Sequence, residues 1–191
     1  AFAVARMVQR KQHVGGELAA LFQHLIDDVG IDFGVHRKLL ELSFDVQPDK
    51  RGRGPQAVEL VNFVTTNDVT KLAEGQAQYS AILNERGTIE DDCLVYRFPE
   101  HLMIVVNASN REKDLAHLEA RVGNLDVTID DISDAIALLA LQGPKAAEIL
   151  QPLTDANLST IKYYHFAQGT VVGLPNIIIS RTGYTGEDGF E

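Results

Sequence analysis

Cysteine is almost absent from this chain of 191 residues, in which Cys93 is the only one. A single cysteine excludes an internal disulfide framework and any zinc site built from several cysteines. We expect Cys93 to be a small buried residue in a reducing compartment, which is the cytoplasm, or the mitochondrial matrix if the source is eukaryotic. The six histidines never fall at His-x3-His spacing, so the sequence predicts no metal site.

Basic residues and long apolar runs are also scarce. Seventeen Lys and Arg against 27 Asp and Glu give a net charge of −10, which argues against nucleic acid or an anionic membrane as the main partner. No apolar stretch approaches the length that spans a bilayer, and the opening Ala-Phe-Ala-Val-Ala is too short for a signal peptide. Because the sequence does not begin with Met, we expect it to have been trimmed or cut from a longer chain.

The spacing of apolar residues predicts a mixture of helices and strands without regular βαβ alternation. The expected helices are Glu17 to Val29, one that begins at Pro55, and Asn110 to Val122; the expected strands are Gln78 to Leu83, Asp92 to Phe98, Leu102 to Ala108, Asn124 to Ile129 and Asn176 to Ser180. The stretch Ala135 to Gln142 fits either type, and Gly143-Pro144 predicts a turn before another helix. The fold class indicated is α+β, an antiparallel sheet with flanking helices.

The register of two expected hairpins predicts a cluster around Asp92. If Glu85-Arg86 forms a two-residue turn, Tyr79 lies opposite Asp92 in the first hairpin. If Pro99-Glu100 forms the turn of the second hairpin, Asn107 lies opposite Asp92. Directly opposed Cβ atoms are about 5 Å apart, so one carboxylate would sit between a phenol and a carboxamide.

Two interpretations of this cluster stay open from the residues alone. Asp91 and Asp92 are compatible with solvated charges at the mouth of a hairpin. However, Asp92 leads directly into an apolar run, and a partly buried carboxylate needs partners such as Tyr79 and Asn107. Tyr96 lies on the same face, four residues further along. A carboxylate held in this way can orient an amine or take a proton from it.

The tract from Arg181 to Glu191 combines three glycines, three carboxylates and Tyr184 directly after an expected strand. Glycines at a spacing of three let the backbone take positive φ angles and approach a ligand closely. The tract is not a GxGxxG fingerprint, so no phosphate loop is implied. A solvated acidic connection and a ligand-binding loop are both compatible with its composition.

Taken together, ordered motifs from about Phe44 to Glu191 closely resemble the glycine cleavage system T-protein family, the tetrahydrofolate-dependent aminomethyltransferases. The motifs are Phe44-Asp-Val, Arg53-Gly-Pro-Gln-Ala, Thr66-Asn-Asp-Val, Gly75-Gln-Ala-Gln-Tyr79-Ser, Asp91-Asp92, Val95-Tyr96, Val105-Val-Asn107-Ala, Glu112-Lys-Asp114, Leu141-Gln-Gly-Pro144 and Ser180-Arg-Thr-Gly-Tyr-Thr-Gly-Glu-Asp-Gly-Phe-Glu191. So many matches in order are more specific than any single motif.

The resemblance implies transfer of a one-carbon unit from an aminomethyl group on the lipoyl arm of H-protein to tetrahydrofolate, with release of ammonia. It implies that Asp92 matches the acid that faces the folate nitrogens and activates the folate amine. It also implies a folate cavity, with a further acid that contacts the pterin at Glu191. The residues that match positions lining that cavity are Tyr79, Tyr96, Asn107, Tyr163 and Tyr184.

Departures from the family pattern affect both ends of the match. After Phe44-Asp-Val the family continues Ser-His-Met, whose Met touches folate, whereas this chain continues Gln47-Pro-Asp-Lys. The family is about twice this length, so we expect a truncated chain that binds folate weakly and turns over poorly by itself. Residues 55–150 are expected to form a central α+β domain, and residues 1–54 and 151–191 parts of a second, incomplete domain.

Two other functions remain open. One is a folate-binding relative without transferase activity, of the kind that assists iron-sulfur assembly, although Cys93 does not match the cysteine motif of those proteins. The other is the folate domain of a dimethylglycine or sarcosine dehydrogenase, which would require a flavin domain upstream.

Overall fold

The structure is a computed structural model that describes residues 37–43, 56–134, 136 and 138–191. These residues divide into two compact units: a sheet unit that ends at Ser133, and a hairpin unit from Asp134 to Glu191. The division differs from the expected 55–150 domain, because strand β1 (Arg37–Ser43) belongs to the sheet unit and helix α4 (Ala146–Leu150) to the hairpin unit. The helix predicted from Glu17 to Val29 lies outside the described residues.

The sheet unit is built on a five-stranded antiparallel sheet with the strand order β2-β3-β4-β1-β5. Besides β1, its strands are β2 (Ala77–Leu83), β3 (Ile89–Arg97), β4 (His101–Asn107) and β5 (Thr128–Asp131). The predicted meander of three strands is confirmed as β2, β3 and β4. Strand β1 was missed because its sequence, Arg-Lys-Leu-Leu-Glu-Leu-Ser, does not alternate strictly between apolar and polar residues.

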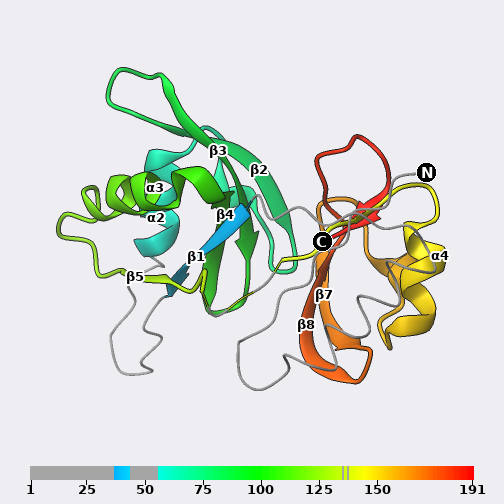
Figure 1. Cartoon of the computed structure of the whole chain (residues 1–191). Coiled ribbons are helices and arrows are strands. Elements are labelled where there is room, and N and C mark those ends of the chain that lie inside the picture. The colour runs from blue at the N-terminus through cyan, green and yellow to red at the C-terminus, as the bar shows by residue number, and fades with distance from the viewer. Residues whose placement is uncertain (1–36, 44–55, 135, 137) are drawn as a thin grey trace, which may run out of the picture. The chain divides into compact units, whose positions relative to one another are not determined.

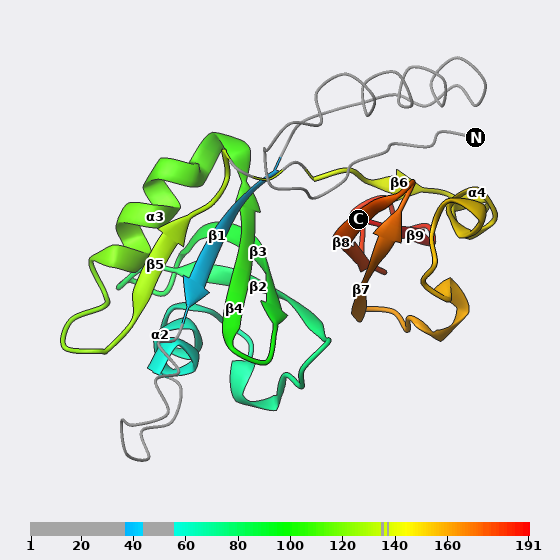
Figure 2. The same cartoon turned by 90° about the horizontal axis from the view of Figure 1, so that it is seen from below.

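Two α-helices, α2 (Gln56–Val64) and α3 (Arg111–Glu119), cover one face of this sheet (Figures 1 and 2). The helix predicted to begin at Pro55 is confirmed as α2, and the helix predicted from Asn110 to Val122 ends earlier, at Glu119. The buried core under the helices includes Ala57, Leu60, Val61 and Val64 from α2, Leu118 from α3, and Ile82, Cys93, Val95, Leu102, Ile104 and Val106 from the sheet. Full burial of such a side chain stabilises the fold by about 2 kcal/mol. Short 3-10 helices are Val69–Lys71 and Ala108–Asn110.

The predicted register is correct for the second hairpin and wrong for the first. Between β3 and β4, Leu94 pairs with Val105 and Tyr96 with Met103, and the turn at Pro99-Glu100 is closed by the Phe98 amide donating to the His101 carbonyl. These pairs follow the register predicted from the turn at Pro99-Glu100. This register extends one pair further to bring Asn107 opposite Asp92.

In the first hairpin Tyr79 pairs with Leu94, and Asp92 pairs with Ala81. The turn after Asn84 holds three residues, because the Asn84 amide donates to the Thr88 carbonyl, and the register shifts again between Ile82 and Leu83. The longer turn moves the pairing by one residue from the predicted register, and the shift between Ile82 and Leu83 moves it by one more, so the total displacement is two residues. Since side chains alternate with period two, Tyr79 keeps the face of Asp92 but lies diagonally from it.

The hairpin unit contains two pairs of antiparallel strands and α4 (Figure 1). Strand β6 (Leu141–Gln142) pairs with β9 (Gly189–Phe190), and β7 (Phe166–Val171) pairs with β8 (Leu174–Ser180); the 3-10 helices are Gln151–Leu153 and Leu158–Thr160. The predicted turn at Gly143-Pro144 followed by a helix is confirmed, and the end of the ambiguous stretch before it is strand β6. The core consists of Leu141, Ala146, Leu158, Ile161, Val171, Ile177, Ile179 and Phe190. No helix in the described part of the chain is long and apolar enough to cross a membrane.

Candidate functional site

Asn107 joins two neighbouring carboxylates in the sheet unit. Its Nδ2 atom donates to Oδ1 of Asp91 at 2.8 Å and to Oδ1 of Asp92 at 2.5 Å, and its backbone amide donates to Oδ2 of Asp91 at 3.4 Å. Asn107 is the last residue of β4, where its side chain reaches both acids of the adjacent strand. The expected juxtaposition of Asp92 and Asn107 is therefore present, and Asp91 is a third member of the group.

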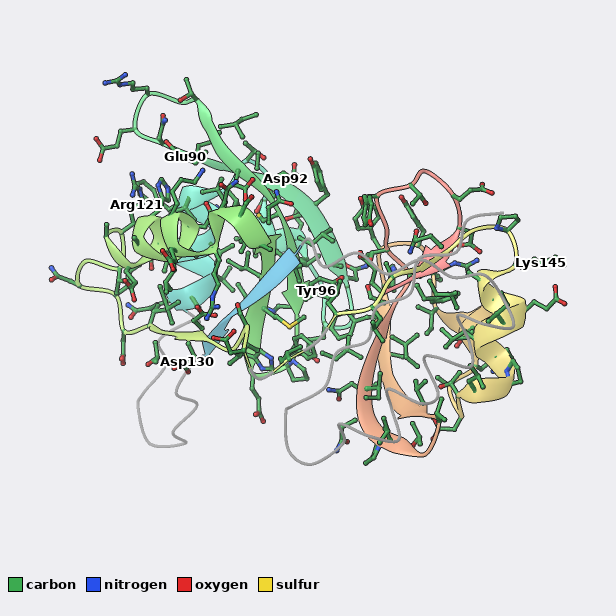
Figure 3. The ribbon with its side chains drawn as sticks, in the orientation of Figure 1. Glu90, Asp92, Tyr96, Arg121, Asp130 and Lys145 are labelled. Atoms are coloured by element: carbon green, nitrogen blue, oxygen red, sulfur yellow. The ribbon has the colours of Figure 1, made fainter. Side chains whose placement is uncertain are left out.

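The two acids lie on opposite faces of β3, because successive side chains of a strand alternate. Asp91 pairs with Ile82 and shares the helix-covered face with Cys93. It is 7% exposed. Asp92 is partly exposed and shares the other face with Tyr96, four residues along the strand (Figure 3). The Asn107 amide thus connects a buried acid on the helix side with an accessible acid on the opposite side.

Hydrogen bonds keep Asp91 ionised in spite of its burial. Burial acts to raise the pKa of Asp91, but hydrogen bonds from the side chains of Asn107, Asp114 and Asn110 outweigh it and hold the pKa below 3.8. A carboxylate with several donors is stabilised in its charged form. The Asn107 amide is therefore held from one side by a fixed negative charge.

The two predicted tyrosines of the sheet unit differ in accessibility. Tyr79 is 47% exposed on the face that carries Asp92, so its ring is available to a flat ligand. Tyr96 is 2% exposed, opposite Met103, so its ring is part of the packed strand face.

In the hairpin unit, a charged pair holds the glycine-rich tract closed. The Nε and Nη2 atoms of Arg181 donate to the two carboxylate oxygens of Asp188 at 2.8 and 2.6 Å. The Arg181 guanidinium also donates to the Ile161 carbonyl at 3.0 Å and lies 5.5 Å from the centre of the Phe190 ring. Hydrogen bonding from Arg181 holds the pKa of Asp188 below its ordinary value. The tract therefore forms a loop with fixed ends, from which Tyr184 projects with 53% exposure.

The side chain of Gln142 forms hydrogen bonds with three residues of the same tract. Its buried side chain donates to the carbonyls of Thr182 and Phe190 at 3.0 and 3.4 Å and accepts from Thr185 Oγ1 at 3.3 Å. A Cβ atom on Gly183 would lie 1.9 Å from Gln142 Oε1. This glycine is therefore required by close packing, since its φ angle is not among the positive ones.

Glu191 has one satisfied and one unsatisfied carboxylate oxygen. It is 7% exposed, and its Oε2 atom accepts a hydrogen bond from Thr182 Oγ1 at 2.7 Å. Its Oε1 atom is buried and has no hydrogen-bond partner among the described residues. An unpaired buried acceptor of this kind is suited to a ligand that brings an N–H group.

Tyr163 and Tyr164 form an edge-to-face pair with ring centres 4.6 Å apart and planes at 80°. Tyr163 is 61% exposed, and Tyr164 has the positive φ angle of 57°, which is strained for a tyrosine. The Tyr164 amide donates to the Arg181 carbonyl at 3.0 Å, which places the pair beside the glycine-rich tract.

Sequence reasoning missed three residues that support these groups. The sequence does not distinguish the role of Tyr164 from that of Tyr163, because no local pattern predicts the positive φ angle of Tyr164. Gln142 lies in the motif Leu141-Gln-Gly-Pro144, and the motif by itself does not indicate which groups its side chain contacts. Asp114 belongs to the Glu112-Lys-Asp114 motif in the first turn of a helix. Acids are common in a first turn because they interact favourably with the helix dipole, so the sequence gives no sign that Asp114 is buried.

Comparison with known proteins agrees with this fold. A solved aminomethyltransferase T of the glycine cleavage system from Bartonella henselae has a TM-score of 0.63 and 33% identity, covering 81% of this chain and 38% of that one. A heterotetrameric sarcosine oxidase from Corynebacterium sp. U-96 has a TM-score of 0.54 at 16% identity, covering 81% and 70%, and it shares the fold alone. The sheet and the glycine-rich hairpin unit therefore define an aminomethyltransferase-type fold.

Sequence comparison gives the family. Residues 48–191 match the model described as GCVT N-terminal domain, and the chain belongs to this family. The aminomethyltransferase of Koribacter versatilis is 48% identical over 151 residues, or 78% of this chain and 40% of the relative. That of Rubrobacter xylanophilus is 40% identical over 201 aligned positions, or 99% and 54%. The chain thus spans about half the length of the relatives it matches or less, and the predicted resemblance to this transferase family is confirmed.

Proposed function

We propose that the protein containing this chain is the aminomethyltransferase of the glycine cleavage system. It would transfer a one-carbon unit from the aminomethyl-lipoyl arm of H-protein to tetrahydrofolate and release ammonia. Membership of the GCVT family supports the reaction class. The observation that carries the assignment to residues is the hydrogen bond from the Asn107 amide, which holds the partly exposed Asp92 carboxylate in a fixed position on the strand face opposite the helices.

Asp92 is the proposed catalytic residue. When bound, tetrahydrofolate supplies the amine that accepts the one-carbon unit. The Asp92 carboxylate would accept a hydrogen bond from that amine and orient it. It would take the amine's proton as the new carbon–nitrogen bond forms and the bond from the transferred carbon to the departing ammonia breaks. Asn107 prevents rotation of Asp92, because its Nδ2 atom is also bonded to Asp91.

The described residues are compatible with a folate ligand in two respects. The Oε1 atom of Glu191, which has no partner in the described part of the chain, is suited to an amino group of the pterin. The half-exposed rings of Tyr79, Tyr163 and Tyr184 offer flat apolar surface with a polar end. We propose these four side chains as folate contacts, and Tyr96 as a residue of the packed face that supports them.

The proposal is tested by the Asp92→Asn variant in the full-length protein, with methylene-tetrahydrofolate formation as the readout. The amide keeps the size of the carboxylate but cannot take a proton, so we expect a loss of about a hundredfold or more. Asp130→Asn is the matched control, because Asp130 is an exposed acid in β5 of the same unit. Unchanged turnover in the Asp92 variant would remove Asp92 from this role.

Assays of folate binding and of ammonia release with the wild-type protein distinguish the proposed activity from the non-catalytic alternative. Folate binding without H-protein-dependent ammonia release would favour the non-catalytic folate-binding relative. We place the protein in the cytoplasm, or the mitochondrial matrix of a eukaryote, since the buried thiol of Cys93, which forms no disulfide with a described residue, is compatible with a reducing compartment.

A further inference from the structure

Asp114 has the smallest exposed fraction of any acidic side chain in the described part of the chain, 0%. It lies in the first turn of α3, whose other buried residue is Leu118, one turn further along. A carboxylate withdrawn from water needs donors or a cation to offset the loss of hydration. Neither carboxylate oxygen of Asp114 accepts a hydrogen bond from a described N–H or hydroxyl group. The nearest cation, Lys113 Nζ, is 3.9 Å away and also contacts Glu90.

The group that meets Asp114 is the carboxylate of Asp91. Asp91 projects from the helix-covered face of β3, and the two side chains lie within hydrogen-bonding reach of each other. Two ionised carboxylates cannot hydrogen bond, since both only accept. One shared proton satisfies the pair, with the hydroxyl on one acid donating to the other.

The surroundings decide which acid keeps the proton. Asp91 receives hydrogen bonds from Asn107 and Asn110, whereas no other described side chain or amide donates to Asp114. Burial lowers the pKa of His117, one turn along α3, which disfavours a positive charge on its ring. Burial and the neighbouring Asp91 raise the pKa of Asp114 to about 7, with Glu90 adding to the effect and Lys113 opposing it.

We propose that Asp114 is a positioning residue for the reaction: its protonated carboxyl donates to Asp91, and Asp91 in turn fixes the Asn107 amide that holds Asp92. The inference rests on the proposed function, in which Asp92 faces the folate amine. Asp114 acts from the helix side of the sheet and does not touch the substrate. Its ionisation would bring a second negative charge against Asp91 and loosen the hold on Asn107.

The first test uses NMR and needs no turnover. The side-chain amide signals of Asn107 are followed in the 191-residue chain as the pH is raised. We expect them to shift with a midpoint near pH 7 in the wild type. The shift should be absent in Asp114→Asn, whose amide still donates to Asp91 but cannot ionise. Asn107 signals that do not respond between about pH 5 and pH 9 in the wild type would overturn the proposal.

The second test compares kcat in the full-length protein for Asp114→Asn and Asp114→Leu. Leu keeps the branching at Cγ but cannot donate to Asp91, so kcat should fall about ten- to a hundredfold with a smaller change in KM for tetrahydrofolate. Asn should restore most of that loss and abolish the decline of kcat above about pH 7. The control is Glu112→Gln, which removes an exposed acid from the same helical turn and should leave kcat and its pH profile unchanged.

The two tests separate the failure of this inference from that of the proposed function. Equal kcat values and parallel pH profiles for the wild type and both Asp114 variants would overturn the role of Asp114, while the transferase activity would stand. A wild-type protein that forms no methylene-tetrahydrofolate would refute the proposed function, and the NMR titration would still decide whether Asp114 controls Asn107. If the Leu variant does not fold, the Asn variant and the titration are sufficient.

Discussion

Replacing Asp114 by Asn should change the unfolding free energy in a manner that depends on pH. The pKa of Asp114 is raised from 3.8 to about 7 in the folded protein. The folded state therefore binds this proton more tightly than the unfolded state, and stability falls as the pH rises between these two values. Below the lower value the carboxyl is protonated in both states, so its ionisation costs nothing. Above the upper value it is ionised in both states, and the full cost of the buried charge applies.

The size of the effect follows from the difference between the folded and unfolded pKa values of Asp114. A difference of about three pKa units, at about 1.4 kcal/mol per unit, lowers the unfolding free energy by about 4 kcal/mol once the group is ionised. The amide of the Asn variant cannot ionise and keeps a donor toward Asp91, so it avoids this cost. The unfolding free energy of the variant, relative to that of the wild type, should therefore rise by about 4 kcal/mol as the pH is raised from about 4 to about 8.

Urea unfolding at a series of pH values, followed by circular dichroism, measures this difference. Glu112→Gln serves as the control, because Glu112 is exposed in the same turn of α3 and its difference from the wild type should stay flat. Unfolding free energies of Asp114→Asn and wild type that run parallel across the range would refute the reasoning, since they would mean that Asp114 ionises with an ordinary pKa.

Three further predictions concern the hairpin unit. Val172 has a φ angle of 52° in the turn between β7 and β8, a conformation that asparagine adopts more readily than valine. Val172→Asn should therefore raise the unfolding free energy by about 1 kcal/mol in a thermal melt. An unchanged melting temperature would contradict the strain at Val172. Gly183→Ala should destabilise by about 1–3 kcal/mol because its Cβ would meet Gln142; combining it with Gln142→Ala should cost less than the sum of the two changes, and strict additivity would argue against the clash. Hydrogen bonding from Arg181 lowers the pKa of Asp188, which supplies stability above the unfolded pKa that is lost as the pH falls through the folded value. The protection of residues 181–191 against hydrogen exchange, relative to the intrinsic rate at each pH, should therefore fall below about pH 4 and, with Asp188→Asn, at neutral pH; unchanged protection would show that the ion pair does not hold the loop.

Local patterns in the sequence predicted most of the elements. The period of two identified the meander, and the apolar spacing after Pro55 identified α2, because one face of each element must be buried against the core. The turn at Pro99-Glu100 also fixed the second hairpin, so that Asn107 was correctly expected beside Asp92. By contrast, β1 was not recognised, since its place between β4 and β5 depends on pairing with distant segments.

The chemistry of the candidate site depended more on tertiary structure. The sequence by itself determined the family, the types of residue available and the neighbourhood of Asp92, because these follow from motifs and from local hairpin geometry. Only the tertiary structure decided that Asp91 turns toward α3, that Asp114 meets it with no donor from elsewhere in the described residues, and that Gln142 fills the space left by Gly183. The physical reason is that burial, and with it the proton affinity of a carboxyl group, is a property of the surrounding side chains, which come from segments far apart in the chain.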